Sequence, residues 1–350
     1  MASTTSPIVS KILHLSDLEL ALLLCLVSRE HGIITTPSAC LSLLTTELSL
    51  VATRTFGLTC SIIDCTPSTT LDDFASALLL PPKSAQQPQQ PDYFVHSPQR
   101  SVHASPLSPS SQIANCILAK NLNLAPKSVQ IQALELLRTR RIFTRTSVQI
   151  APKQFIFIPV LEAEAPGKGE RVTSHLNDFF SLAHWHDPDE GFVNIDEEDE
   201  ADEVERGFAG GVNRRDGSHS ALIPESEISH LAQLSQQVQV DIEVTRYQMN
   251  IVSFLRMHRA VADGITPNAT KHLDKLMRCL APLHGVDFVA PALVGVAVKK
   301  VYLHRIRITS PEDERSMQWG SKLEAVAAIL ADMGPEEVVE DVLGMVTAPI

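Results

Sequence analysis

The stretch NCILAKNLNLAPKSVQIQALELLRTRRI, residues 115–142, decides the fold. Its first five residues form a short, mostly apolar run, which predicts a buried strand over 115–119. Residues 128–142 then carry apolar side chains at positions 129, 131, 134 and 137, a spacing that predicts a helix. A strand that leads into a helix through a short turn is the repeating unit of an α/β domain. Lys120 and Asn121 directly follow the strand.

The same alternation extends to both sides of this stretch. Ser16 followed by Glu19 is a capping-box pattern, so we expect a helix over 16–31, with Gly32 ending it. We expect further strands at 32–34, 60–65 and 154–162, and further helices at 38–56 and 69–79. From Pro224 onward only helical patterns occur. The sequence therefore predicts an α/β fold, with a parallel sheet flanked by helices, followed by an all-helical lid domain.

Two segments interrupt this pattern. Between residues 81 and 112, 20 of 32 residues are Pro, Ser or Gln, and Asp187–Glu205 contains eleven acids and no base. Such compositions cannot bury enough apolar area to offset the entropy of ordering, so we expect both segments to be disordered. The predicted organisation is an α/β domain in two parts (1–80 and 113–186), disordered segments at 81–112 and 187–217, a lid at 218–308 and a helical extension at 309–350.

Composition narrows the protein class. The 350 residues are 44% hydrophobic, and the formal net charge of −12 is concentrated in the acidic segment. No basic stripe suggests nucleic-acid binding, and no apolar run is long enough to cross a membrane. The six cysteines form no CxxC pair, and no secretory signal is evident. We therefore expect reduced cysteines and an intracellular protein, cytoplasmic or nuclear.

Three blocks of sequence carry a family likeness. Residues 120–142 match the pattern D-E-I-N-R-A-P, K-V-Q, A-L-L-E at Asn123, Pro126 and Gln130, among others. TFGLTCSIIDCTPSTTLDDF (55–74) and the lid segments GITPNA (264–269) and DFVAP (287–291) follow in the family order. Over roughly 17–80, 113–186 and 222–308, the chain resembles AAA+ ATPases of the magnesium chelatase subunit I and MoxR type. The resemblance implies an AAA+-like sheet and lid around Mg-ATP.

The residues that handle phosphate in that family are replaced here. A phosphate-binding loop needs glycines and a lysine, but 34–48 has neither; Thr45 or Thr46 falls near the family's Mg²⁺-binding hydroxyl. Lys120 and Asn121 stand where the resemblance places the metal-binding Asp and the Glu that orients water. A lysine there would repel Mg²⁺, although it could pair with phosphate.

Three further positions depart from the family pattern. The polar sensor at the end of the next strand falls near Leu161 or Glu162. Asp178, in HLNDFF (175–180), replaces the arginine finger, and Asn268 replaces the lid arginine of S-P-R-A. With all five devices absent, efficient hydrolysis has no evident route.

These substitutions favour a degenerate module. We expect a non-hydrolysing scaffold or regulatory subunit without a cofactor, whose partners are other protein subunits, such as an active AAA+ paralogue, or further copies of this chain. The alternative is an ATP-dependent motor subunit of a magnesium chelatase-like complex, which would use Mg-ATP. A module that binds nucleotide without hydrolysis, and an unrelated α/β protein with chance matches, are the remaining alternatives.

Other candidate residues have a functional and a structural interpretation. His184 and His186, beside Asp187, share one face of a strand and could bind a metal, or they simply end the strand. His258 and His284 are expected to pack or cap lid helices, and Cys60 and Cys65 to face opposite sides of a strand. Met317 and Trp319, in the polar run PEDERSMQWGS (311–321), form a docking surface or tuck onto the lid.

Overall fold

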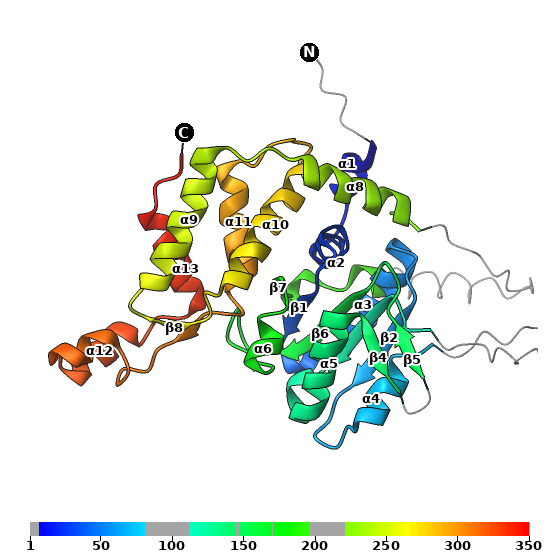
Figure 1. Cartoon of the computed structure of the whole chain (residues 1–350), viewed down its shortest axis with the longest axis horizontal. Helices are drawn as coiled ribbons and strands as arrows, with labels where there is room; N and C mark the ends of the chain where they lie inside the picture. Colours follow the sequence, from blue (N-terminus) through cyan, green and yellow to red (C-terminus); the bar gives the residue numbers. More distant parts are fainter. Residues whose placement is uncertain (1–6, 81–111, 145–146, 170, 197–220, 350) are drawn as a thin grey trace, which may run out of the picture.

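The computed structural model describes residues 7–80, 112–144, 147–169, 171–196 and 221–349 (Figure 1). Most of the two segments predicted to be disordered, 81–111 and 197–217, lies outside these residues, so their disorder stays a prediction. Two parts, called layers below, are visible: a sheet with helices on both faces, and a set of helices beside it. The predicted α/β class with a helical lid is confirmed.

The central sheet has five strands, all parallel, in the order β2-β3-β6-β1-β7. Because every strand runs the same way, the carboxyl ends of all five meet at one edge of the sheet. Lys120, at the end of β3, pairs in register with Asp64 of β2 and Val160 of β6. The strands are β1 (Gly32–Thr36), β2 (Cys60–Asp64), β3 (Cys116–Lys120), β6 (Ile156–Glu162) and β7 (Leu182–Trp185).

The helices that precede or connect the strands are short, and a small hairpin follows α5. They are α1 (Pro7–Ile12), α2 (Asp17–Ser28), α3 (Leu41–Leu50), α4 (Leu71–Ala77), α5 (Lys127–Thr139) and α6 (Ser174–Asn177), with the hairpin β4 (Arg141–Phe143) and β5 (Val148–Ile150). The predicted capping box of α2 is confirmed, because Ser16 and Glu19 each accept the other's backbone N–H. The helix ends at Arg29, whereas Gly32 begins β1.

The lid and the extension are helical apart from one small strand pair. Their elements are α8 (Glu225–Gln237), α9 (Ile242–Met257), α10 (Pro267–Leu283), α11 (Pro291–Tyr302), α12 (Leu323–Leu330) and α13 (Pro335–Met345), with β8 (Val261–Asp263) pairing β9 (Arg307–Ile308). In Figure 1, α12 extends away from the rest of the lid.

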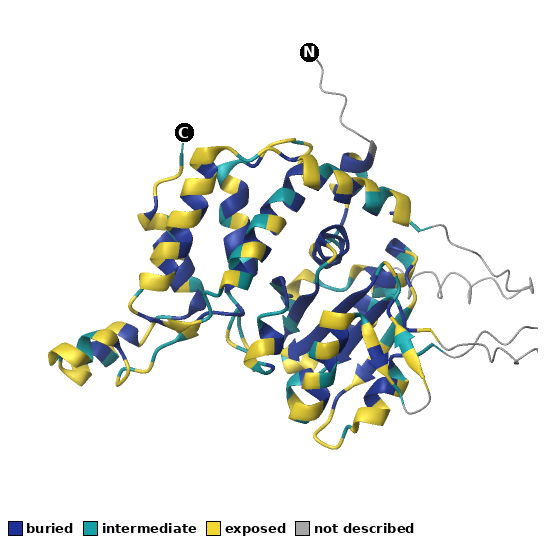
Figure 2. Ribbon diagram, viewed as in Figure 1, coloured by how far each residue is buried: buried dark blue, intermediate teal, exposed yellow. Residues whose placement is uncertain are grey.

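Helix α2 joins the two layers (Figure 2). Nine of its twelve residues are buried, and Leu22 and Leu23 are fully buried. A helix that is apolar on all sides must be covered on all sides. Accordingly, its side chains belong to one continuous apolar core that runs from one sheet face into α8, α10 and α11. A second core, with Phe74, Phe157 and Phe180, fills the opposite sheet face beneath α4 and α5.

The first ten residues of the predicted acidic loop are folded, which differs from the expectation. Residues 187–196 contain a 3₁₀ turn, Pro188–Glu190, and a helical turn after it. The buried carboxylate of Glu47 accepts the backbone N–H groups of Asn194 and Ile195, both at 3.0 Å, and the Phe192 ring packs 5.0 Å from that of His186. The composition signal missed this anchor because Glu47 comes from a distant helix.

Candidate functional site

The connection between β1 and α3 occupies the place of the phosphate-binding loop. Four residues, Pro37–Cys40, form it, and Ser38–Cys40 is a 3₁₀ turn. The N–H groups of Cys40 and Leu41 donate to Pro37 and Ser38 carbonyls, respectively. A phosphate-binding loop instead leaves several backbone N–H groups free and relies on glycines to aim them at phosphate. In this connection, the N–H groups of Cys40 and Leu41 are instead bonded within its own turn.

Lys120 lies across the start of α3. Its ammonium donates to the Ser42 hydroxyl at 3.0 Å and lies 4.0 Å from the Asp64 carboxylate of the neighbouring strand. Ser42 is in the first turn of α3, where the helix amides would otherwise face a bound anion. The cation therefore occupies the space between β3 and α3 that the family resemblance assigns to a metal ion.

Thr45 and Thr46 lie one turn further along α3. The Thr45 hydroxyl is buried and donates to the Leu41 carbonyl at 2.7 Å, and the Thr46 hydroxyl donates to the Ser42 carbonyl at 3.1 Å. Both hydroxyls are thus bonded back to the helix that carries them. Ser42, which sequence reasoning missed, is the hydroxyl that contacts Lys120.

Asn121 and Glu162 complete the carboxyl edge of the sheet. Asn121 adopts left-handed backbone angles, with φ of 53°, and its N–H donates to Val160. Asparagine tolerates this region better than most residues, which explains its place in the tight turn after β3. Glu162 ends β6 as an exposed carboxylate, while the preceding Leu161 is buried. These positions add no second cation to the edge.

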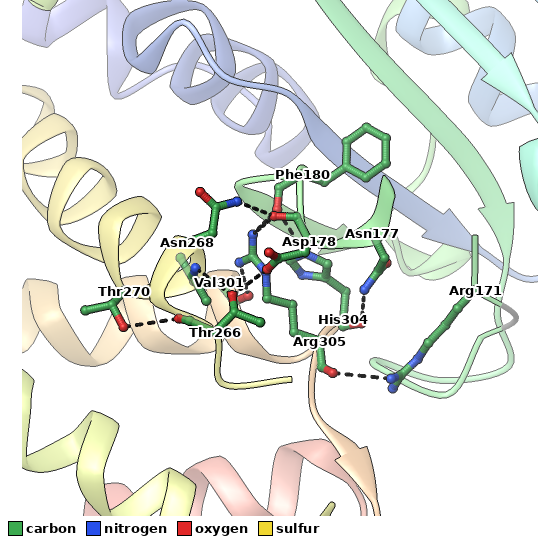
Figure 3. A network of polar contacts seen from close by, with 11 residues as sticks. Arg171, Asn177, Asp178, Phe180, Thr266, Asn268, Thr270, Val301, His304 and Arg305 are labelled. Carbon is green, nitrogen blue, oxygen red and sulfur yellow. Dashed lines mark hydrogen bonds and ion pairs between the residues drawn. The ribbon is translucent and has the colours of Figure 1, made fainter. Parts of the chain in front are cut away.

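Asp178 and Asn268, predicted independently as altered nucleotide-site positions, contact each other (Figure 3). The Asn268 side-chain amide donates to the Asp178 carbonyl at 2.7 Å. Thr266, the N-cap of α10, donates to the Asp178 carboxylate at 2.6 Å and accepts the Ala269 N–H at 3.0 Å. The two positions therefore hold α10 of the lid to the end of α6 within one chain.

Arg305 is the centre of this contact. Its side chain is 1% exposed, and its guanidinium donates to the carbonyls of Val301 at 2.8 Å, Asp178 at 3.1 Å and Phe180. The Asp178 carboxylate lies 3.5 Å from its Nε atom. Burial lowers the pKa of Arg305 to about 10, with Asp178 opposing that shift, so the group stays charged at neutral pH.

Neighbouring groups extend the same contact. Arg171 donates to the Ile306 carbonyl at 2.7 Å, and the Asn177 amide donates to the His304 carbonyl at 3.0 Å. A ring nitrogen of His304 lies 3.1 Å from the Phe180 carbonyl, and burial holds the pKa of this histidine well below its usual range. We call Arg305, Asp178, Thr266, Asn268, Asn177, His304 and Arg171 the lid lock. Sequence reasoning found only two of its members.

The contacts of His184, in β7, and of His186, directly after β7, are structural. His184 lies 3.0 Å from the Lys300 ammonium of α11, and burial, together with that cation, lowers its pKa to about 3. The His186 ring lies 3.6 Å from the Glu190 carboxylate, and the backbone N–H of His186 donates to the Thr35 carbonyl. In the described part of the chain, no group of three or more His, Cys, Asp or Glu side chains has the arrangement of a metal site.

The remaining sequence candidates separate into inward and outward residues. His258 bonds Asp341 at 3.1 Å and accepts the Ala260 N–H, so it links α9 to α13. Cys60 of β2 lies opposite Cys116 of β3 in the strand register. Cys60 and the buried Cys65 are both free thiols. Trp319 is 88% exposed, whereas Met317 is half-buried against the lid core. The indole therefore does not tuck onto the described part of the lid.

Comparisons with known proteins agree with the fold. The family model of the AAA lid domain matches residues 253–326. A crystal structure from Cytophaga hutchinsonii, provisionally described as an ATPase, superposes with a TM-score of 0.62 at 14% identity, over 98% of this chain and 93% of that chain. No curated protein matches the sequence. The chain thus has the AAA+ fold: a parallel sheet flanked by helices, with a C-terminal helical lid. No helix among the described residues is long and apolar enough to cross a membrane.

Proposed function

We propose that this chain is a degenerate AAA+ module that does not hydrolyse ATP and serves as a scaffold or regulatory subunit in a protein assembly. The observation that carries the proposal is the contact of Lys120 with Ser42 at the start of α3. Catalysis of phosphoryl transfer depends on preorganised groups that stabilise charge on the phosphate and the metal. Here an internal cation replaces the metal ligand, and the N–H groups of Cys40 and Leu41 donate to carbonyls of the same turn.

The lid lock supports the same proposal. In an ATP-driven module, the lid has to respond to the state of the nucleotide, so its contacts must differ between states. In this chain, Arg305 and Asp178 satisfy each other across the junction between the sheet and the lid. Such a module offers partners one fixed arrangement of sheet and lid. The partners we propose are other protein subunits, including an active AAA+ paralogue of the magnesium chelatase or MoxR type, in the cytoplasm or nucleus.

The competing function is an ATP-dependent motor subunit of a magnesium chelatase-like complex. The AAA+ fold and the lid-domain match favour it, because both accompany ATP use in the family that the sequence resembles. The two functions differ in what they require of the β1–α3 connection. A motor must bind Mg-ATP there and release phosphate; a scaffold need do neither.

Nucleotide titration separates these functions. A fluorescent ATP analogue with Mg²⁺ is titrated into the full chain, and phosphate release is followed in the same samples. We expect no saturable micromolar binding at this edge and no release above background. The variants are Lys120→Ala and Ser42→Ala, with Lys127→Ala as the control because Lys127 is exposed at the start of α5. Phosphate release that depends on Mg²⁺ and is lost in Ser42→Ala but kept in Lys127→Ala would establish the motor.

A further inference from the structure

A pocket at the opposite edge of the sheet is lined by three basic side chains. It has a volume of about 410 Å³ and lies where α2 and α5 end, β6 begins and α8 passes over them. Arg29, Arg140 and Lys153 line it, and Glu225 is the single acidic residue among its lining residues. The volume is in the range of small-ligand sites. We call it the rim pocket.

Two of these cations sit in unusual backbone positions. Arg29 ends α2 with φ of 53°, and Arg140 ends α5 with φ of 55°. Helices commonly end on one residue in this left-handed region, but glycine or asparagine normally fills it, because other side chains strain the backbone there. Of the three non-glycine residues with positive φ among the described residues, two are these arginines. Strained positions concentrate at functional sites.

The charged groups of the rim pocket are largely free to meet a ligand. Among the described residues, none of the three cations has an ion-pair partner within 4.0 Å, and the guanidinium of Arg140 donates only to the Lys153 carbonyl, at 3.3 Å. Nearby Glu30 is already paired with Lys275. Burial, and secondarily the positive charges of Arg140 and Lys275, lower the pKa of His31, beneath the pocket, to about 3. Three cations against one carboxylate leave an excess of two positive charges.

We propose that the rim pocket binds a phosphate monoester, held by Arg29, Arg140 and Lys153. The excess charge matches a phosphate group, which carries about −1.5 to −2 at neutral pH. Guanidinium groups present parallel N–H donors that fit phosphate oxygens, and Ser229 adds a hydroxyl to the pocket wall. Leu26, Phe155 and Ile228 supply an apolar wall, so the phosphate should be carried on an apolar group. Free phosphate has the same chemistry but does not use that wall.

The test compares two probes by phosphorus NMR titration of the full chain: inorganic phosphate and phenyl phosphate. We expect saturable binding of both, with phenyl phosphate the tighter probe. Equal affinities would identify free phosphate as the ligand and remove the apolar carrier from the proposal. Arg29→Gly and Arg140→Asn should each weaken binding by about tenfold or more, the loss of one charged hydrogen bond. Glycine and asparagine suit these backbone positions, so the thermal midpoint should not fall.

The control is Arg246→Gln, which removes an exposed arginine of α9 and should leave phosphate binding unchanged. Absence of saturable millimolar binding by the unmodified chain overturns the proposal. So does equal binding by Arg29→Gly and the unmodified chain. The pocket is also separable from the nucleotide edge: weak ATP binding that is lost in Arg29→Gly but kept in Lys120→Ala belongs to the rim pocket and leaves the proposed function intact.

Discussion

Replacing Arg305 by methionine removes the charge at the centre of the lid lock while keeping a long apolar side chain. Arg307, two residues on, provides the matched control. Its guanidinium is 54% exposed and pairs with Asp263 on the surface of the β8–β9 pair. Both substitutions delete one guanidinium from the same short segment. They differ in whether the charge is buried between the sheet and the lid.

The contacts of Arg305 set the size of the expected effect. Its loss leaves the carbonyls of Val301, Asp178 and Phe180 without this donor, and leaves the Asp178 carboxylate without its cation. Breaking a buried charge pair by removing one partner destabilises a protein by about 3–5 kcal/mol. Exposed pairs contribute about 1 kcal/mol or less. Arg305→Met should therefore cost about 3–5 kcal/mol, and Arg307→Met about 1 kcal/mol at most.

Urea unfolding of the full chain measures the difference. Trp185 of β7 reports the sheet by fluorescence, and circular dichroism reports mainly the helices; the exposed Trp319 contributes little change. With a denaturant slope of about 3 kcal/mol per molar, the urea midpoint of Arg305→Met should fall by about 1–1.7 M. If Arg305→Met and Arg307→Met unfold at the same urea concentration, the lid lock does not hold the lid, and the argument from it is refuted.

Three further predictions concern pH, the nucleotide edge and assembly. Burial holds the pKa of His31, His184 and His272 at about 3, below that of the unfolded chain, so their contribution to stability is complete above about pH 6.5 and is lost as pH falls. Each of these three histidines should lower the free energy of unfolding by about 2 kcal/mol as the pH falls from 6.5 to 5. A thermal midpoint that stays unchanged down to about pH 4.5 would contradict this. Lys120→Asp should introduce measurable Mg²⁺ binding near Ser42, detected by calorimetry; heats identical to those of the unmodified chain argue against a vacated metal position. Trp319→Ala should weaken any self-assembly by about 2 kcal/mol in sedimentation velocity without lowering the thermal midpoint, and assembly that requires ATP would count against a closed nucleotide site.

The fold could be predicted because its information is local. The spacing of apolar residues predicts the strands and helices, and the contact between Ser16 and Glu19, within one turn, marks the start of α2. The strand order β2-β3-β6-β1-β7 was not predicted, because it depends on pairing between segments far apart in the sequence. The boundary at Arg29 was misplaced for a physical reason: an arginine in the left-handed region gives no local sign that a helix ends there.

The candidate site was only partly predictable. Lys120 is the last residue of β3 and Asn121 follows it, one residue later than predicted, because the strand and its turn lie within the same short stretch. Ser42 was missed because the start of α3 depends on how many residues the preceding 3₁₀ turn uses. Arg305 was missed because a cation in the run YLHRIRI is expected on the surface; its burial depends on carbonyls from residues 178 and 180, more than a hundred positions earlier.

The position of the charges, more than their number, decides what ATP could do to this chain. The family resemblance implies an arginine reaching out from the segment at residue 178 and another from the lid at residue 268. Here Asp178 and Asn268 bond one another, and the arginine that meets them, Arg305, comes from the same chain. A ligand shifts a conformational equilibrium only by the difference in its affinity for the two states. For each ~1.4 kcal/mol by which the closed lid is favoured, ATP would have to bind the open form about tenfold more tightly than the closed form. The β1–α3 connection has no glycine, two of its N–H groups are bonded within its own turn, and Lys120 lies across it, so it offers few contacts from which such a difference could arise. The lid and the sheet should therefore stay together whatever the nucleotide concentration, as the proposed scaffold role requires.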